Sequence, residues 1–267
     1  MIRLAVRAPA AQAELVLAEL LAIAPSGVEQ VDGEGWIEYA VYGAPGELPS
    51  LPEGEAVVAG VRVRVSGEPT PDDWAERWKR FHRPVLIADR LYVRPPWEEP
   101  AIRPGVLEIV IDPGQAFGTG AHATTALTLE LLCGLDASGS FVDLGCGSGV
   151  LSIAAAKLGF SPVGAYDADV LAVDATRANA RANGVELDAV ERFDLRQGPA
   201  PSAQTVAANL MRPLLLSLAN RFEPPRALVL SGLLGHEADE VAAAFSPLAE
   251  ERRVLDRGWA ALLLCRS

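Results

Sequence analysis

The sequence has few cysteines and no long apolar run. Its cysteines are Cys133, Cys146 and Cys265, and their number and spacing fit neither a disulfide framework nor a zinc site. No stretch approaches the roughly 18 consecutive apolar residues of a membrane-spanning helix. The N-terminus places arginines in an alternating pattern, where a secretory signal would have an apolar core. We therefore expect a cytosolic protein without a metal site or a membrane segment.

Basic residues, and lysines above all, are also scarce. Arg and Lys together number 23 against 35 Asp and Glu, so the formal net charge is −12 and the isoelectric point lies near 4.8. Lys79 and Lys157 are the only lysines. An acidic surface repels nucleic acid and suits a basic partner. The charge balance therefore disfavours nucleic acid as a direct substrate.

The first 69 residues have the pattern of a small α+β domain. Strands are predicted at residues 2–7, 28–31, 36–42 and 57–65, with a hairpin signal at Asp32-Gly33. Residues 10–23 form the clearest helix. Its apolar side is expected to consist of Leu15, Leu17, Leu20 and Leu21. This order favours a ferredoxin-like fold whose second helix is lost or shortened in the loop 44–54.

Residues 70–84 are predicted to link this domain to the rest of the chain. Thr70 to Asp73 caps a helix that contains WAERWKRF, and Trp74, Trp78 and Phe81 lie on one side of it. Core packing, or a staple between the domains, is favoured over a ligand site. The predicted organisation is a domain over 1–69, a linker helix over 70–84 and a domain over 85–267.

A glycine-rich turn between an apolar strand and a helix organises the second domain. In the stretch FVDLGCGSGVL, a short buried strand is followed by Gly145, Gly147 and Gly149 and by a helix from Val150. Glycines let a ligand approach the backbone, and the first helical N–H groups face it. The compressed G-x-G-x-G, with Asp143 before it, resembles motif I of class I S-adenosylmethionine-dependent methyltransferases. The acid would help hold the loop and the ammonium end of the ligand. A glycine turn in another kind of α/β protein is the alternative.

A second acid follows the next strand. Residues 161–166 are predicted to form that strand, and Asp167 closes it. A carboxylate at this point of a βαβ unit can accept hydrogen bonds from both ribose hydroxyls. Asp167 is alternatively the N-cap of the helix that begins near Val170, a role that Asp169 can fill equally well.

Strands and helices alternate through the second domain. Strands are predicted at residues 85–93, 106–111, 141–144, 161–166, within 185–193, and at 205–208, 226–230, 252–255 and 259–265. Helices are predicted at residues 124–135, 150–158, 170–183, 214–222 and 236–245. This order is typical of a parallel sheet covered by helices on both faces. With one antiparallel strand inserted by the final hairpin, it predicts an α/β, Rossmann-like sheet of seven strands, the class I methyltransferase layout.

The segment DPGQAFGTGAHATT, residues 112–125, lies between a predicted strand and a predicted helix. Its glycines, hydroxyl side chains and histidine do not fill a core. A loop that helps to form a site is therefore favoured over an elaborate start of the helix.

Together these segments resemble one family, the lysine methyltransferases of large-subunit ribosomal protein eleven. The resemblance rests on DPGQAFGTGAHATT, FVDLGCGSGVLSIAAAKLG, the strand end at Asp167, ANARANGV at 178–185, VAANL at 206–210 and LVLSGLL at 228–234. It covers about residue 72 to the C-terminus, while the first domain agrees in pattern and length only. Two departures are Val170, which stands where the family usually has proline, and a slightly short connection between Thr125 and Gly145.

The resemblance implies S-adenosylmethionine as cofactor and the lysine side chains of the ribosomal protein as methyl acceptors. Its N-terminal amine is a further candidate acceptor. It implies cofactor contacts at Thr125, Gly145, Asp167 and Asn209. The full candidate cofactor site comprises Gly118, Thr119, Gly120, Thr125, Asp143, Gly145, Gly147, Gly149, Asp167 and Asn209. The first domain is expected to grip the ribosomal protein, and the enzyme is expected to be a monomer.

The expected reaction assigns catalytic roles to three residues. A lysine side chain has an ordinary pKa of about 10.4, so it must lose a proton before it attacks a sulfonium methyl. Asn209 can offer its amide oxygen to the amine N–H. Amide-directed methyltransferases often have N-P-P-Y here, and the N-L-M-R of this chain argues against glutamine or base methylation. His122 can accept the proton or make a structural hydrogen bond in its loop. Phe117 either lines the methyl channel or pins the loop.

Three other functions stay open from the sequence. A member of the same family can act on another basic protein, which only substrate tests would reveal. A small-molecule or RNA methyltransferase is the second, although the acidic balance opposes RNA. The third is a non-catalytic cofactor-binding module, against which the intact Asn209 and the complete GTG-x-H-x-TT sequence count.

Overall fold

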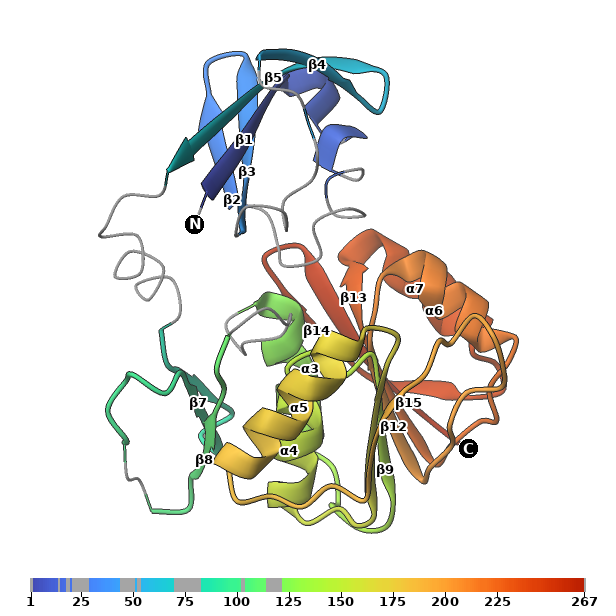
Figure 1. Ribbon diagram of the computed structural model, residues 1–267. Helices are drawn as coiled ribbons and strands as arrows, with labels where there is room; N and C mark the ends of the chain where they lie inside the picture. Colours follow the sequence, from blue (N-terminus) through green and yellow to red (C-terminus); the bar gives the residue numbers. More distant parts are fainter. Residues whose placement is uncertain are drawn as a thin grey trace. The chain divides into compact units, whose positions relative to one another are not determined.

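The computed structural model describes residues 2–13, 15–17, 20, 29–43, 51, 54–69, 83–101, 104–113 and 122–266. The chain divides into two compact units, residues 1–81 and 82–267, which have separate sheets and separate hydrophobic cores (Figure 1). Outside the described residues lie most of the loop 44–54 and the linker aromatics Trp74, Trp78 and Phe81. Within the described part, no helix is long and apolar enough to cross a membrane.

A five-stranded antiparallel sheet forms the first unit. Its strands are β1 (Ile2–Pro9), β2 (Glu29–Gly33), β3 (Trp36–Gly43), β4 (Gly54–Val58) and β5 (Val61–Pro69), in the order β2-β3-β1-β5-β4. A short 3-10 turn, η1 (Ala10–Gln12), leads from β1 into a helix. The buried Val16 and Leu20 of this helix share a core with Val6 and Tyr39 of the sheet. The order β2-β3-β1-β5 is that of a ferredoxin-like fold, as predicted, and β4 extends its edge.

Two details predicted for the first unit are wrong. The single strand expected over residues 57–65 is a hairpin, in which Ala59 and Gly60, with φ of 50° and 77°, join β4 to β5. The hairpin buries Val58 and leaves Val57 66% exposed. The expected apolar face of the helix is also wrong at Leu15, which is 57% exposed.

The second unit is built on a seven-stranded sheet, as predicted. Its strands, in spatial order, are β11 (Ala189–Arg192), β10 (Val163–Asp167), β9 (Phe141–Leu144), β12 (Thr205–Asn209), β13 (Ala227–Leu234), β15 (Trp259–Cys265) and β14 (Ala249–Asp256). Only β15 runs antiparallel to both of its neighbours. The chain moves outward from β9 through β10 to β11 and then returns to β12 on the other side of β9. Such a reversal opens a crevice at the carboxyl ends of the strands, where α/β sheets bind ligands.

Helices cover both faces of this sheet, which confirms the predicted layers. Helices α3 (Ala123–Cys133), α4 (Val150–Leu158) and α5 (Val170–Ala182) lie on one face, and α6 (Arg212–Ala219), η2 (Gly235–Glu237) and α7 (Ala238–Ala244) follow on the other. Strand side chains alternate between the two cores: Ala207 packs with Leu129 of α3, whereas Val206 and Ala208 pack with Leu215 of α6. Both faces of the central strands are therefore dry, and polar groups gather at their ends.

A three-stranded sheet precedes the large one in the second unit. It consists of β6 (Val85–Ile87), β7 (Leu91–Arg94) and β8 (Leu107–Val110), in that order. The single strand expected over residues 85–93 is wrong, because the chain reverses at Ala88 and Asp89, whose φ values are 48° and 52°. Strand β8 runs parallel to β7 and leads directly to Asp112.

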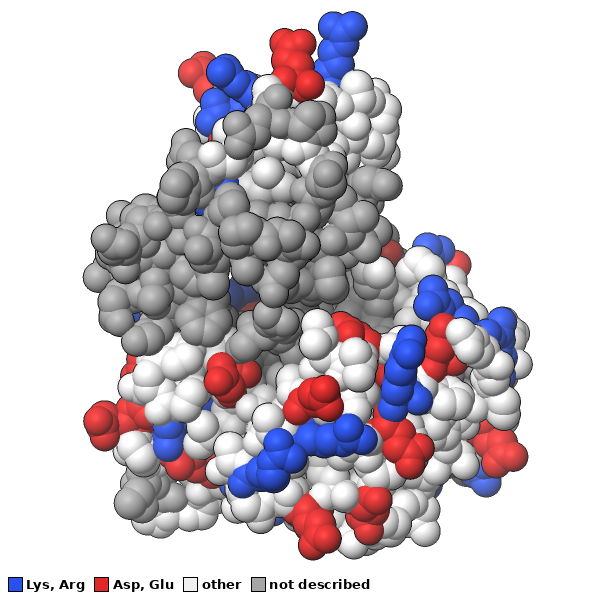
Figure 2. All heavy atoms as spheres, in the orientation of Figure 1, with Lys and Arg blue, Asp and Glu red and all other residues white. Residues whose placement is uncertain are grey.

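Charged side chains of both signs are interspersed over the second unit on the face shown in Figure 2. Among the charged residues of the second unit, Arg212 forms an ion pair with Glu240 and Arg252 forms one with Glu130, each at 2.6 Å. On the described residues of this face, the acidic excess is therefore distributed and not gathered in one patch.

Candidate functional site

The glycine loop joins β9 to α4 in a conformation that requires glycine. Gly145, Gly147 and Gly149 have φ values of 81°, 52° and 81°, a left-handed region that side chains disfavour. A Cβ at Gly145 would lie 2.4 Å from Cδ2 of Leu210, and one at Gly149 would lie 2.8 Å from Cγ2 of Thr176. The N–H groups of Gly145 and Cys146 both donate to the carbonyl oxygen of Tyr166, at 2.8 and 3.0 Å. Neighbouring strand β10 therefore holds the loop in place.

Asp167 closes β10 and holds the middle of the glycine loop. Its Oδ2 accepts a hydrogen bond from the N–H of Gly147 at 3.0 Å, and its Oδ1 accepts one from the N–H of Asp169 at 3.0 Å. Asp169 is the N-cap of α5, since its Oδ1 accepts from the N–H of Leu171 at 2.9 Å. The two acids thus divide the roles that the sequence left open between them. Each Asp167 oxygen keeps a further lone pair for a ligand.

Asp143 lies beneath the loop and not on the wall of a cavity. It is 0% exposed, and its Oδ2 accepts a hydrogen bond from Oγ of Ser152 at 2.7 Å. Its Oδ1 has no hydrogen-bond partner among the described residues. Burial raises the pKa of this carboxyl to about 7; the Ser152 bond opposes the rise and the charge of Asp167 adds to it. The expectation that Asp143 reaches the ammonium end of a ligand is corrected by this burial, because α4 covers the side chain.

A cavity of about 560 Å³ opens at the carboxyl ends of β9, β10 and β12. Its size falls within the range of small-molecule sites, roughly 300–1,000 Å³. The candidate cofactor residues that line it are Thr125, Gly145, Gly147, Asp167 and Asn209. Gly149 and Asp143 are not among the lining residues: Gly149 is the N-cap of α4, and Asp143 is buried.

Two groups of lining residues were missed from the sequence. Phe193 to Arg196 follow β11. Leu210, Met211, Pro213 and Leu214 follow β12 at the start of α6, and Met211 is 71% exposed. Their position in the sequence could have revealed them. Both groups come directly after parallel strands, and the carboxyl ends of parallel strands meet at one edge of the sheet.

Asn209 lies between the cavity and the start of α3. Its Nδ2 donates to Oγ1 of Thr124 at 3.3 Å and to Oγ1 of Thr125 at 3.4 Å. Oγ of Ser231, which is fully buried, lies 2.9 Å from the carbonyl oxygen of Ala260 and 3.2 Å from that of Thr124, so its hydroxyl bonds at this junction. Because the amide nitrogen faces the threonines, the amide oxygen of Asn209 is the atom left for a ligand.

Gly232 is a structural requirement of this site that the sequence did not single out. It has φ of 84° at the irregularity in β13 between Ser231 and Leu233. A Cβ there would lie 2.4 Å from the carbonyl oxygen of Leu210. The backbone after Asn209 therefore passes so close to β13 that only glycine fits.

His122 is the N-cap of α3. Its Nδ1 lies 2.8 Å from Oγ1 of Thr124 and accepts from the N–H of Thr124 at 3.4 Å, while its ring meets Trp259 edge to face at 5.3 Å. Burial lowers the pKa of the imidazole, which favours the neutral ring that an acceptor role needs. The remaining candidates of this segment, Phe117, Gly118, Thr119 and Gly120, lie outside the described residues.

Known proteins resemble this chain over most of its length. The family model described as ribosomal protein L11 methyltransferase (PrmA) matches residues 57–266. A ribosomal protein L11 methyltransferase of Symbiobacterium thermophilum is 42% identical over 200 residues, which cover 72% of this chain and 65% of that protein. One of Alteromonas mediterranea is 38% identical over 214 residues, which cover 78% of this chain and 73% of that protein.

A solved structure agrees with these relatives. The crystal structure of ribosomal protein L11 methylase from Lactobacillus delbrueckii subsp. bulgaricus superposes with a TM-score of 0.62 and 25% identity, covering 70% of this chain and 100% of that chain. The matches with the relatives from Symbiobacterium thermophilum and Shewanella halifaxensis span 65% and 61% of those proteins, less than two thirds of their length. The family model nevertheless covers the glycine loop, Asp167 and Asn209 within its 57–266 match. The chain belongs to the ribosomal protein L11 methyltransferase (PrmA) family.

Proposed function

We propose that this chain transfers the methyl group of S-adenosylmethionine to lysine side chains of ribosomal protein L11, as a monomer in the cytoplasm. The observation that carries the proposal is the meeting of the glycine loop, Asp167 and Asn209 around one cavity of about 560 Å³. The names of the relatives supply the substrate. The acidic net charge of −12 suits a basic protein and disfavours a direct nucleic-acid substrate.

The residues present fit this cofactor. Asp167 has lone pairs for ribose hydroxyls. Gly145 and Gly147 have no side chains, so a ligand can contact their backbone in the same cavity. Phe193 and Leu195 offer apolar surface beside them. The bound cofactor would supply a methyl group on a positively charged sulfur. A neutral amine can attack this methyl carbon in line, and the sulfur then leaves as a neutral thioether.

Asn209 is the residue proposed to position the amine. Its Nδ2 is fixed by the hydroxyls of Thr124 and Thr125, so the plane of the amide is set before a substrate arrives. Its Oδ1 can then accept an N–H of the lysine amine and direct the nitrogen lone pair toward the methyl group. The oxygen also favours the positive charge that the nitrogen gains on methylation. The proposed cofactor contact of Asn209 is compatible with this role.

The first test is methyl transfer from labelled S-adenosylmethionine to a mixture of ribosomal proteins. We expect label in one basic protein, L11, and in its lysine residues after digestion. Asn209→Ala should lower kcat more than it weakens the Kd for S-adenosylhomocysteine. Asn220→Ala is the matched control, because in the described part of the chain the exposed side chain of Asn220 donates only to the carbonyl oxygen of Leu216, at the end of α6. Label in another protein would overturn the substrate, and no label in any protein would overturn the activity.

Residues 1–69 are proposed to dock the ribosomal protein, with residues 70–84 as the link to the methyltransferase domain over 85–267. Every described residue that lines the cavity belongs to the second unit. A chain that begins at Thr70 should bind S-adenosylhomocysteine but lose methylation of intact L11. Undiminished kcat/KM with intact L11 would show that docking lies elsewhere.

A further inference from the structure

The outer edge of β8 is completed by side chains and not by another strand. Strand β8 pairs with β7 on one side, where the N–H groups of Leu107 and Ile111 donate to carbonyl oxygens of β7 residues or their neighbours at 2.8 and 2.9 Å. The backbone groups of residues 108, 110 and 112 point to the opposite edge, because successive residues of a strand alternate. Unpaired backbone groups at a covered edge would be costly. These groups therefore need partners from elsewhere in the fold.

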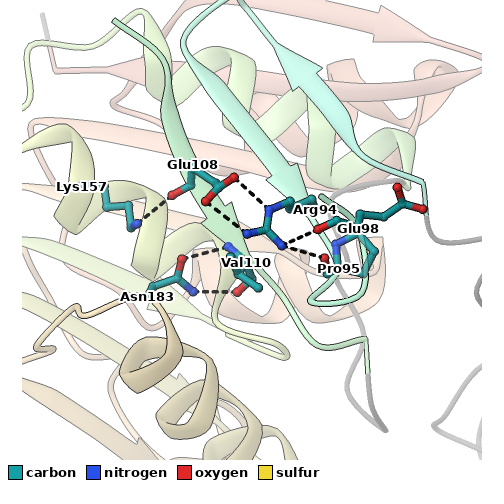
Figure 3. Close-up of polar contacts among 7 residues, drawn as sticks. All are labelled: Arg94, Pro95, Glu98, Glu108, Val110, Lys157 and Asn183. Carbon is teal, nitrogen blue, oxygen red and sulfur yellow. Dashed lines mark hydrogen bonds and ion pairs between the residues drawn. The ribbon is translucent and has the colours of Figure 1, made fainter. Parts of the chain in front are cut away.

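The partners come from α4 and α5, the two helices that flank the cofactor site. Lys157 of α4 donates from Nζ to the carbonyl oxygen of Glu108 at 2.7 Å. Asn183, which follows α5, accepts the N–H of Val110 at 2.8 Å and donates to its carbonyl oxygen at 2.6 Å (Figure 3). Figure 3 also shows Arg94 of β7. Its Nε donates to Oε1 of Glu108 at 2.8 Å, and its Nη2 donates to Oε2 at 3.3 Å. The small sheet is thus tied to the large one through β8.

Asn179 makes the third of these contacts and differs from the others. Its Oδ1 accepts the N–H of Asp112 at 3.1 Å, just past the end of β8. Its Nδ2 donates to the carbonyl oxygen of Ser148, in the glycine loop, at 2.9 Å. The side chain is buried, with 4% of its surface exposed. One rigid amide therefore joins the glycine loop to the point where the chain leaves β8.

The chemistry of this position requires an amide. One partner, the N–H of Asp112, is a donor, and the other, the carbonyl of Ser148, is an acceptor. A carboxylate satisfies only the first and would repel the second, and an apolar side chain satisfies neither. Asn183 has the same residue type and bonds the same strand, but its partners are Val110 and the carbonyl of Asn179, not the glycine loop.

We propose that Asn179 is a positioning residue of the cofactor site: it sets the place of the glycine loop relative to Asp112, so that the loop and the end of β8 move as one. The inference rests on the proposed function for its consequence, namely that ligand affinity depends on Asn179. A purely structural tie would stabilise the fold equally at Asn179 and Asn183 and leave the glycine loop alone.

The test compares Asn179→Asp with Asn183→Asp in the full-length chain. Both variants keep the acceptor, and both lose the donor when the new carboxyl is ionised, so they are matched in chemistry and are compared at alkaline pH. Hydrogen–deuterium exchange without ligand should rise about tenfold across residues 146–150 in Asn179→Asp, since a lost hydrogen bond to the loop is worth about a factor of ten in opening. In Asn183→Asp, exchange should rise only around residues 108–112. The Kd for S-adenosylhomocysteine should weaken about tenfold in the first variant and less than about twofold in the second.

Two outcomes would overturn the proposal. One is an unchanged glycine loop in Asn179→Asp, and the other is an equal loss of affinity in both variants. If the aspartate variant fails to fold, Asn179→Ser and Asn183→Ser, in which the new side chain is smaller and uncharged, give the same comparison. If the parent protein does not bind S-adenosylhomocysteine, the proposed function fails, while the exchange data still decide whether Asn179 holds the loop.

Discussion

Two aspartates stand at the ends of neighbouring strands and have opposite surroundings. Asp143 of β9 is fully buried, with one oxygen on Ser152 and the other without a partner among the described residues. Asp167 of β10 lines the cavity, and both of its oxygens accept backbone N–H groups. Asp143 pairs with Ala165, which comes two positions before Asp167 in β10. That small difference in register decides which acid is covered by α4 and which one a ligand can reach.

The two acids therefore hold different parts of the site, since Asp167 bonds the glycine loop and Asp143 bonds Ser152 of α4. Asp167 accepts a hydrogen bond from the N–H of Gly147 on the cavity side, where solvent or a ligand can also hydrogen-bond to the carboxylate. Asp143 lies in the dry core under α4, where an ionised carboxylate is costly. Substitutions of the two acids and of their partners are expected to separate these roles.

Asp143→Asn should remove a pH dependence of stability. In the folded chain the Asp143 pKa is about 7, against 3.8 for an unperturbed carboxyl. Between these values the folded state holds a proton that the unfolded state releases, so stability falls as pH rises and the full loss is reached above pH 7. The shift corresponds to roughly 4 kcal/mol. Urea unfolding at pH 5 and pH 8 should show the parent losing stability relative to the variant. Parallel changes in the two proteins would contradict the burial argument.

Asp167→Ala should weaken cofactor binding without a comparable loss of stability. The variant loses the acceptor proposed for the ribose hydroxyls and the bond to Gly147, about 1.5–3 kcal/mol for bonds to a charged group. The Kd for S-adenosylhomocysteine should rise roughly tenfold to hundredfold, as measured by calorimetry.

Asp169→Ala is the matched control for Asp167→Ala. It removes the N-cap of α5 and should cost about 1 kcal/mol of stability, with little change in affinity. Equal affinities for Asp167→Ala and the parent would remove Asp167 from the site.

Ser152→Ala should have the smallest effect and should depend on pH. The variant removes the donor that stabilises ionised Asp143, so the pKa of the carboxyl should rise further. The expected loss is about 1 kcal/mol, larger at pH 8, where Asp143 is ionised, than at pH 5. Urea unfolding of the variant and the parent at both values of pH measures this loss of stability. A loss of the same size at both values of pH would mean that Ser152 acts through packing alone.

The elements predicted from the sequence are mostly confirmed, and the two failures have a common cause. The helix expected from Val150 to Leu158 has those bounds, because a glycine at each end stops it. Both hairpins missed in residues 57–65 and 85–93 turn within apolar runs. Val57 fitted the apolar alternation of a single strand, but it is exposed, and the turn at Ala59 and Gly60 interrupts that alternation. At Ala88 and Asp89, the turn has neither glycine nor proline to announce it.

The sequence by itself determined the order of the layers, the glycine loop and the acid at the end of the next strand. Each of these depends on local spacing: the period of apolar residues, the positive φ that glycine permits, and the reach of a strand end. Only the tertiary structure decided that Asp143 is covered, that Asn209 faces Thr124 and Thr125, and that Asn179 joins Ser148 to Asp112. These contacts link residues far apart in the chain. Their partners are chosen by the packing of helices on the sheet, which no local pattern encodes.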